Sequence, residues 1–173
     1  MTKKNNLVLS KDVDKGHSTE PKLKFLTEFM TLCGECSADI ARATGLTRGG
    51  VSHWFSSDDC KLSYCEQYIN LKGYELVFEL KKQNSSQNSN VSINIERKAP
   101  EPDESSCRRL MFLLAAMAKH GISKVQMAKD LDLKYNTVRH WFIVDDIYIS
   151  HIFRIAEIYD LKINIDIKPK EEL

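Results

Sequence analysis

A gap-free internal repeat constrains this chain more than any other feature. When the numbering is shifted by 87 residues, residues 23–82 fall on residues 110–169 and share at least 14 identical positions out of 60. Most matched residues are apolar or small and recur at helical spacings, which predicts a duplicated fold with similar cores and different surfaces. The matches include Leu23 with Leu110, Gly34 with Gly121, Ala41 with Ala128, Trp54 with Trp141, Asp58 with Asp145 and Asp59 with Asp146.

The repeat divides the 173-residue chain into two units. Each unit of roughly 60 to 80 residues lies near the lower end of independent stability, so we expect the units to support each other. The polar segment between them contains alternating Val91, Ile93 and Ile95, which predicts one more strand. The expected divisions are an N-terminal tail at 1–20 with a short strand at 7–9, unit 1 at 21–81, a linker at 82–106, unit 2 at 107–168 and a C-terminal tail at 169–173.

Apolar periodicity predicts four helices and a closing strand in each unit, which makes the fold mainly α with short β-strands. Ser63 with Glu66, and Ser123 with Gln126, have the spacing of helix-capping boxes. Unit 1 is expected to repeat the order of unit 2 and to close with a strand at 74–80. In unit 2 the helices are expected at about 106–119, 123–130 and 134–142 and from Ser150 onward, followed by a strand at 161–168.

The second and third predicted helices of each unit have the arrangement of a helix-turn-helix DNA reader. Small residues at Ala41 and Ala128 would let the two helices cross closely. Gly45 and Asp132 stand where the turn requires a left-handed backbone, which Gly adopts freely and Asp tolerates. We expect Trp141 on the buried side of the third helix, so that its polar side can enter a major groove.

At residues 121–133, followed by Val138-Arg139-His140-Trp141, unit 2 resembles the Cro and lambda-repressor (XRE-like) type of helix-turn-helix proteins. The resemblance covers about residues 110–161 and, more weakly, residues 23–73. It implies a tandem of lambda-repressor-like units, double-stranded operator DNA as the partner, and a role as a transcriptional regulator of the repressor type.

The resemblance places the DNA contacts of unit 2 at the starts of its second and third helices. Asn136 has the geometry to bond an adenine edge and Arg139 a guanine edge or a phosphate, each good bidentate contact giving ~1–3 kcal/mol of discrimination. Ser123 and Lys124 are positioned for a backbone phosphate. The alternative interpretation is an ordinary solvated helix face. The candidate contacts are Ser123, Lys124, Lys134, Tyr135, Asn136, Thr137, Arg139 and His140.

Unit 1 departs from the pattern in its third helix. Two successive glycines there, Gly49 and Gly50, each cost ~1 kcal/mol of helix stability relative to Ala. Thr44 also replaces an expected apolar residue. Unit 1 is therefore predicted to be a weaker or more adaptable reader, with Thr47 as N-cap; the alternative is a degenerate half retained for packing. Its candidate contacts are Thr47, Arg48, Gly49, Ser52 and His53.

The positive charge of the chain is concentrated in unit 2. The formal net charge is only +1, so a nucleic acid would have to be held by a local patch. Residues 106–142 contain seven Lys and Arg against two Asp, whereas the equivalent residues 19–55 contain four basic and four acidic side chains. The near-neutral total leaves a rival function open, namely a protein-interaction module such as an antitoxin or adaptor.

The closing strands offer a way to join two units. We expect residues 76–80 and 163–167 to pair across a pseudo-two-fold axis, either within one polypeptide as a pseudo-dimer or between chains as a homodimer.

No secretory segment opens the chain and its longest apolar run, residues 110–118, is nine residues, far short of the roughly 20 needed to cross a bilayer. These features predict a cytoplasmic protein without a membrane partner.

Other chemical motifs are weak. Cys33 with Cys36 and Cys60 with Cys65 could supply thiolates to zinc, but Cys60 and Cys65 align with isoleucines and are expected to be small buried residues. The adjacent Asp pairs are expected to act as caps or turn formers. No nucleophile and base or phosphate-binding loop stands at a recognisable spacing, so we expect neither an enzyme nor a cofactor or metal.

Overall fold

The fold combines eight helices with a three-stranded sheet in the part of the chain that the computed structural model describes, residues 9–13, 20–82 and 107–170. The strand order is β1-β3-β2 and both pairings are antiparallel. The expected class, mainly α with short strands, is confirmed. The elements are β1 (Leu9–Val13), α1 (Lys24–Cys33), α2 (Ser37–Thr44), α3 (Arg48–Ser57), α4 (Leu62–Leu71), β2 (Tyr74–Lys82), α5 (Met111–His120), α6 (Lys124–Asp130), α7 (Tyr135–Val144), α8 (Ile149–Ile158) and β3 (Leu161–Pro169).

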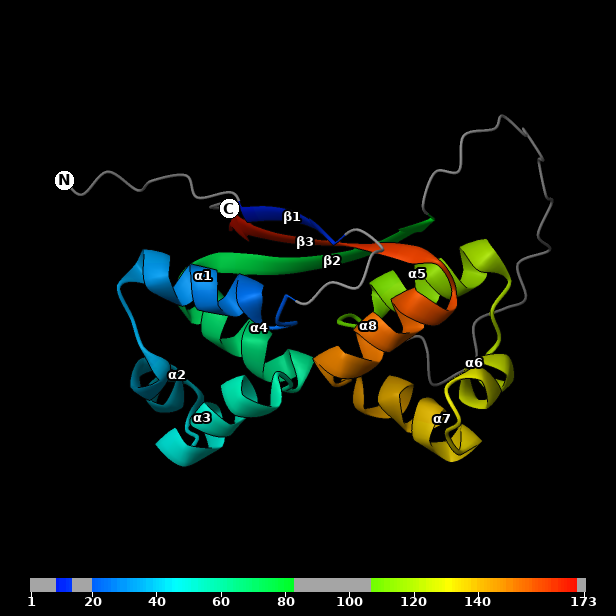
Figure 1. The fold of residues 1–173 in the computed structure, drawn as a ribbon, viewed down its shortest axis with the longest axis horizontal. Helices are drawn as coiled ribbons and strands as arrows, with labels where there is room; N and C mark the ends of the chain where they lie inside the picture. Colours follow the sequence, from blue (N-terminus) through cyan, green and yellow to red (C-terminus); the bar gives the residue numbers. More distant parts are fainter. Residues whose placement is uncertain (1–8, 14–19, 83–106, 171–173) are drawn as a thin grey trace.

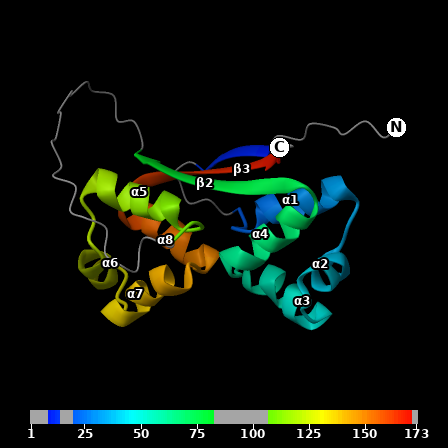
Figure 2. The same cartoon turned by 180° about the vertical axis from the view of Figure 1, so that it is seen from behind.

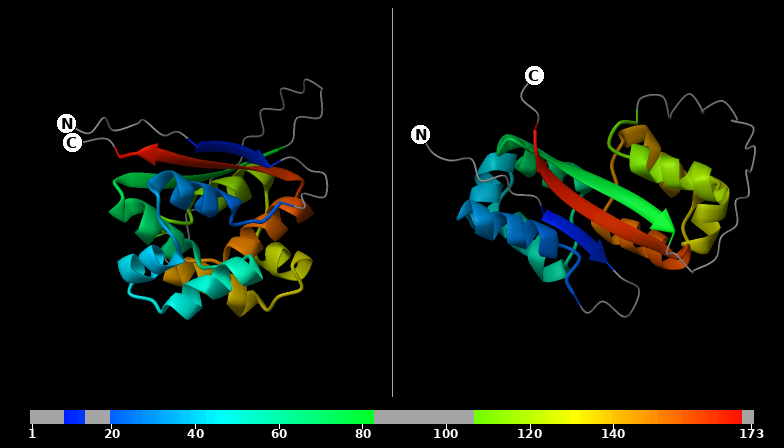
Figure 3. Two further views of the ribbon diagram at one scale, coloured as in Figure 1. Left: turned by 60° about the vertical axis from the view of Figure 1, so that its left-hand side comes forward. Right: turned by 90° about the horizontal axis from the view of Figure 1, so that it is seen from above.

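Figure 1 shows the arrangement of the helices and strands from one side, and Figure 2 shows it from behind. The sheet forms one side of the molecule and spans both units, as the two views of Figure 3 make clear. Helices α4 and α5 pack against β2, and α8 packs against β3. Helices α3 and α7 lie at the side opposite the sheet.

The closing strands of the two units pair along their whole length within one chain. Phe78 lies opposite Ile165, and residues 76–80 face residues 163–167, so the expected pairing is confirmed. Ile165 is also the repeat equivalent of Phe78, because the two positions differ by 87. The register is therefore symmetric, and a pseudo-two-fold axis passes through this pair.

The units meet a second time at the same axis. Lys61 and Tyr148, again repeat equivalents, form a β-bridge. The N–H of Leu62 donates to the carbonyl of Ile147, and the N–H of Ile149 donates to the carbonyl of Cys60, both at 2.9 Å. Two separate joints therefore fix the axis, one in the sheet and one at the starts of α4 and α8.

Buried side chains follow the predicted periods. On β3 the alternating residues Leu161, Ile163, Ile165 and Ile167 are buried. Phe78, at the axis, contacts an aromatic ring from each unit: Phe25 at 5.9 Å and its repeat equivalent Phe112 at 5.5 Å between ring centres. Aromatic pairs at such separations add to the free energy of burial, so the sheet joint is also part of the core.

Two helix starts differ from the prediction because distant carboxylates cap them. Helix α5 begins at Met111 and not near residue 106, since the Asp145 carboxylate accepts the N–H groups of residues 108, 109 and 110 within 3.1 Å and holds them in a turn. Ser63 forms no capping box with Glu66; its N–H and hydroxyl donate to Asp146 of unit 2 at 3.0 and 2.8 Å. Glu66 instead pairs with Arg109.

The segment expected to be an N-terminal tail contributes to the sheet. Strand β1 covers Leu9–Val13 and pairs with the edge of β3 that β2 leaves free. It shares residue 9 with the strand predicted at 7–9, whose first two residues lie outside the described residues. The strand predicted at 91–95 lies outside the described residues. The closing strands run slightly further than expected, to Lys82 and Pro169. None of the described helices is long and apolar enough to cross a bilayer.

Candidate nucleic-acid interface

Unit 2 presents two short helices joined by a tight turn. Ser123 caps α6, because its Oγ accepts the N–H of Gln126 at 3.1 Å. The Gln126 side chain donates to Asp130 at 2.7 Å, so only half of the predicted capping box forms. Asp132 adopts φ 53°, the left-handed conformation expected at the turn. Helix α7 then buries Trp141, which is 6% exposed.

The opposite side of α7 carries polar side chains into solvent. The helix buries only Val138, Trp141 and Phe142, so the intervening positions form a polar row along its first two turns. Such a row can meet the edges of bases in a major groove. The exposed residues among the predicted contacts are Ser123, Lys134, Tyr135, Asn136, Thr137, Arg139 and His140.

Lys124 departs from the prediction. Its side chain is only 7% exposed, and Nζ lies 5.0 Å from the centre of the Phe142 ring. A long aliphatic stem packs readily against apolar surface, and an ammonium above an aromatic face is electrostatically favourable. Lys124 therefore belongs to the packing between α6 and α7, and its assignment as an exposed phosphate contact is wrong.

Unit 1 forms the same arrangement from different residues. Gly45 ends α2 with φ 71°, and Oγ1 of Thr47 accepts the N–H of Gly50 at 3.1 Å, so the predicted N-cap is confirmed. A Cβ added at Gly49 would meet no atom within 4 Å, whereas one at Gly50 would lie 3.2 Å from the capping Thr47 oxygen. All predicted contacts of this unit are exposed: Thr47, Arg48, Gly49, Ser52 and His53.

A carboxylate at the start of α2 distinguishes unit 1 further. Asp39 accepts the N–H of Cys36 at 2.9 Å and pairs with Arg42 at 3.0 Å. The backbone hydrogen bond from Cys36 is the main cause that lowers the pKa of Asp39. The equivalent residue in unit 2 is the uncharged Gln126. On α2, which packs against α3, an acidic group therefore offsets a cation, which reduces the positive charge that unit 1 can offer.

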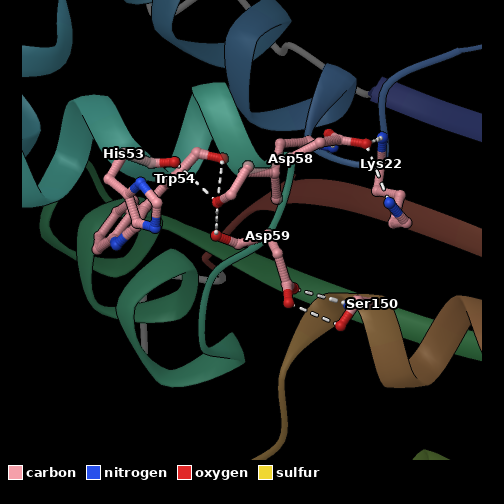
Figure 4. A network of polar contacts seen from close by, with 8 residues as sticks. Lys22, His53, Trp54, Asp58, Asp59 and Ser150 are labelled. Carbon is pink, nitrogen blue, oxygen red and sulfur yellow. Dashed lines mark hydrogen bonds and ion pairs between the residues drawn. The ribbon is translucent and has the colours of Figure 1, made fainter.

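An Asp pair closes the C-terminal end of α3. Asp58 ends the helix with φ 51° and its carboxylate accepts the N–H groups of Lys22 and Leu23 at 2.8 and 3.0 Å, ahead of α1. Asp59 reaches the other unit, where it accepts the N–H and hydroxyl of Ser150 at 2.9 and 2.7 Å (Figure 4). Asp58 therefore caps the segment before α1 in its own unit, and Asp59 caps α8 in the other unit.

The Asp pair after α7 repeats these contacts. Asp145 has φ 50° and caps the segment before α5, while Asp146 caps α4 through Ser63. The expectation that the Asp pairs act as caps and turn formers is confirmed. Sequence reasoning missed that the second Asp of each pair reaches the other unit, because residues 63 and 146 are far apart along the chain.

The cysteines divide into two environments. Cys60 and Cys65 are buried, as their alignment with isoleucines predicted, and their Sγ atoms lie 3.1 Å apart. The neighbouring thiol and burial raise the pKa of Cys65. Cys36 is exposed and Cys33 is partly buried. Within residues 9–13, 20–82 and 107–170, no group of three or more His, Cys, Asp or Glu side chains is placed to hold a metal ion.

Comparison of the chain with protein-family models, with curated proteins and with solved structures found no match.

Proposed function

We propose that this chain is a sequence-specific, double-stranded DNA-binding transcriptional regulator of the repressor type with two unequal helix-turn-helix readers. The observation that supports this most is the placement of α3 and α7, each with an exposed polar row, on the same side of the molecule and related by a pseudo-two-fold axis (Figures 1 and 2). Duplex DNA has local two-fold axes of its own, so helices related in this way can enter successive major-groove segments about 34 Å apart.

Unit 2 is the stronger reader in this proposal. Asn136 and Arg139 read base edges from α7, while Lys134 at its start and Lys129 on α6 supply positive charge near the phosphates; all four are exposed. Occupation of an operator would repress transcription by excluding other proteins from the same duplex.

Unit 1 reads a different and weaker half-site. It offers Arg48, Ser52 and His53 where unit 2 has Tyr135, Arg139 and His140, and it carries the acidic Asp39 on the adjacent helix α2. We therefore expect a preferred site of two dissimilar half-sites in inverted orientation.

Selection of binding sites from random duplex DNA tests the proposal. The expected outcome is enrichment of two dissimilar inverted half-sites at a constant separation. Titration of the selected duplex at several salt concentrations should show affinity falling steeply with salt, since phosphate contacts release counterions. Absence of enrichment would contradict DNA reading, and recovery of perfect palindromes alone would contradict the inequality of the units.

One observation favours a protein-interaction module as a second candidate. Ile143 and Val144, at the end of α7, are 49% and 46% exposed, where unit 1 has Ser56 and Ser57. Exposed apolar side chains in a group can mark a protein contact. A protein partner held there would bind with weak salt dependence and would lose affinity in Ile143→Ser with Val144→Ser, whereas DNA binding should survive that change.

A further inference from the structure

We infer that four reciprocal side chains, Asp59, Ser63, Asp146 and Ser150, fix the separation of α3 and α7 and so restrict the chain to DNA sites with one half-site spacing. We call these four residues the cross-unit latch. The inference rests on the proposed function and adds the element that determines spacing.

The latch joins the end of each exposed helix directly to the other unit. Asp59 lies two residues after the end of α3, and Asp146 lies two residues after the end of α7. Each carboxylate accepts two hydrogen bonds, an N–H and a hydroxyl, from the Ser at the first turn of α8 or α4. Movement of α3 relative to unit 2 would have to break or bend these bonds.

The position of the latch makes it an effective restraint. The other joint, the pairing of β2 with β3, lies at the side of the molecule opposite α3 and α7 (Figure 1). With the sheet as the only joint, a small rotation about the Phe78–Ile165 pair would displace both exposed helices by a larger distance. The latch and the adjacent Lys61–Tyr148 bridge hold the units together away from the sheet and oppose this rotation.

Charge and symmetry also favour the latch as the restraint. Hydrogen bonds to an ionised carboxylate are stronger than neutral ones, and these are partly buried. The ion pair of Glu66 with Arg109 also joins the units, but it occurs on one side only, because the repeat equivalents are Phe153 and Lys22. The latch makes the same two hydrogen bonds on each side of the pseudo-two-fold axis, so it restrains α3 and α7 alike.

A distance measurement in the absence of DNA tests the restraint. Spin labels carried by unnatural amino acids at the equivalent exposed positions Ser56 and Ile143 report the separation of α3 and α7. We expect a narrow distance distribution in the otherwise unchanged chain and a broad one in Ser63→Ala with Ser150→Ala. Ser63→Thr with Ser150→Thr retains the hydroxyls and should restore the narrow distribution. An unchanged width in the Ala variant, and in Asp59→Ala with Asp146→Ala, would overturn the inference.

A control variant distinguishes the loss of the latch hydrogen bonds from the loss of a hydroxyl group elsewhere in the fold. Thr31→Ala removes an exposed hydroxyl that bonds only the Thr27 carbonyl within α1. This variant should keep the narrow distribution. Broadening in Thr31→Ala equal to that of the Ser variants would also overturn the inference, because the effect would then be general softening.

Binding to a series of duplexes tests the consequence for DNA. The two selected half-sites are kept and their separation is changed one base pair at a time. The unchanged chain should lose affinity by roughly tenfold or more when the separation changes by one or two base pairs. The Ser63→Ala, Ser150→Ala variant should lose at most about threefold, with unchanged affinity for a single half-site of unit 2. An equally sharp spacing optimum in both proteins would overturn the inference and leave the proposed function standing; failure of the unchanged chain to bind any duplex would overturn both.

Discussion

The two units share their internal joints but differ in the surfaces they expose. Trp54 and Trp141 are both buried, at 9% and 6% exposed, and each Asp pair makes the same two sets of contacts. The exposed helices differ at nearly every polar position, with Gly49 in unit 1 where unit 2 has Asn136. The comparison indicates that the duplicated chain retained the residues that close the fold, whereas the residues that would meet a ligand diverged.

The largest effect that would sharpen this comparison is on DNA affinity. Arg139→Ala should weaken binding to the selected duplex by roughly 10- to 100-fold, because a base-edge contact of this kind is worth ~1–3 kcal/mol. Arg48→Ala in unit 1 should cost only a few-fold, since its helix contains two glycines and packs against α2, which carries the acidic Asp39. Fluorescence anisotropy at one fixed salt concentration measures both. Equal losses would show that the units are equal readers.

The next effect concerns stability and should appear in unit 1 alone. Gly49→Ala should raise the free energy of unfolding by about 0.5 to 1 kcal/mol, because Ala favours the helix and the new Cβ meets no atom within 4 Å. Gly50→Ala should gain less, since its Cβ would crowd the Thr47 oxygen. Urea unfolding followed by circular dichroism gives both values. A larger gain at Gly50 than at Gly49 would contradict this account of the α3 start.

Local patterns predicted most of the helices and the buried faces, because each depends on residues a few positions apart. The alternation of Ile163 and Ile165 with polar residues gave the strand, and Gly45 and Asp132 marked the turns. The exposed polar row on α7 follows from the same periodicity, and so does the burial of Trp141.

Contacts between distant residues could not be predicted in this way. Ser63 has a suitable capping partner three residues later, yet it bonds Asp146 because the pseudo-two-fold arrangement brings that carboxylate to its helix start. Lys124 looks like a surface cation by residue type, whereas in the fold it packs against Phe142 and is buried. Strand β1 likewise exists through the free edge that β3 offers.

A smaller effect should follow from the charge of Asp39 on α2. Asp39→Gln introduces the uncharged side chain that unit 2 has at Gln126 and should raise DNA affinity about two- to threefold at low salt, because a negative charge near the phosphates is removed. The gain should shrink as salt screens the charge. Glu75→Gln, on the exposed sheet side, removes the same charge away from α3 and serves as the control. Equal gains in both variants would show that only net charge matters.

The smallest effect contrasts the ring pairs that Trp54 and Trp141 form in the two units. In unit 2 the ring centres of the half-buried His151 and of Trp141 lie 4.9 Å apart. Burial lowers the pKa of His151 below its ordinary value of 6.5. Asp59 raises this pKa and Arg154 lowers it, so that the net shift is downward. A depressed histidine pKa means that the unfolded chain takes up its proton first. This residue therefore reduces stability as the pH falls below about 6.5.

Unit 1 has a tyrosine at the position equivalent to His151, and the ring centres of Tyr64 and Trp54 lie 5.4 Å apart. His151→Tyr should therefore flatten the dependence of the unfolding free energy on pH between 7.5 and 5.5, because it removes a titrating ring from unit 2. Tyr64→His should make this dependence steeper, because it adds a titrating ring to unit 1. Some dependence should remain in His151→Tyr, since burial also lowers the pKa of His120. Urea unfolding at a series of pH values measures these slopes. If the two exchanges did not change the slope in opposite directions, the two ring pairs would not occupy equivalent environments.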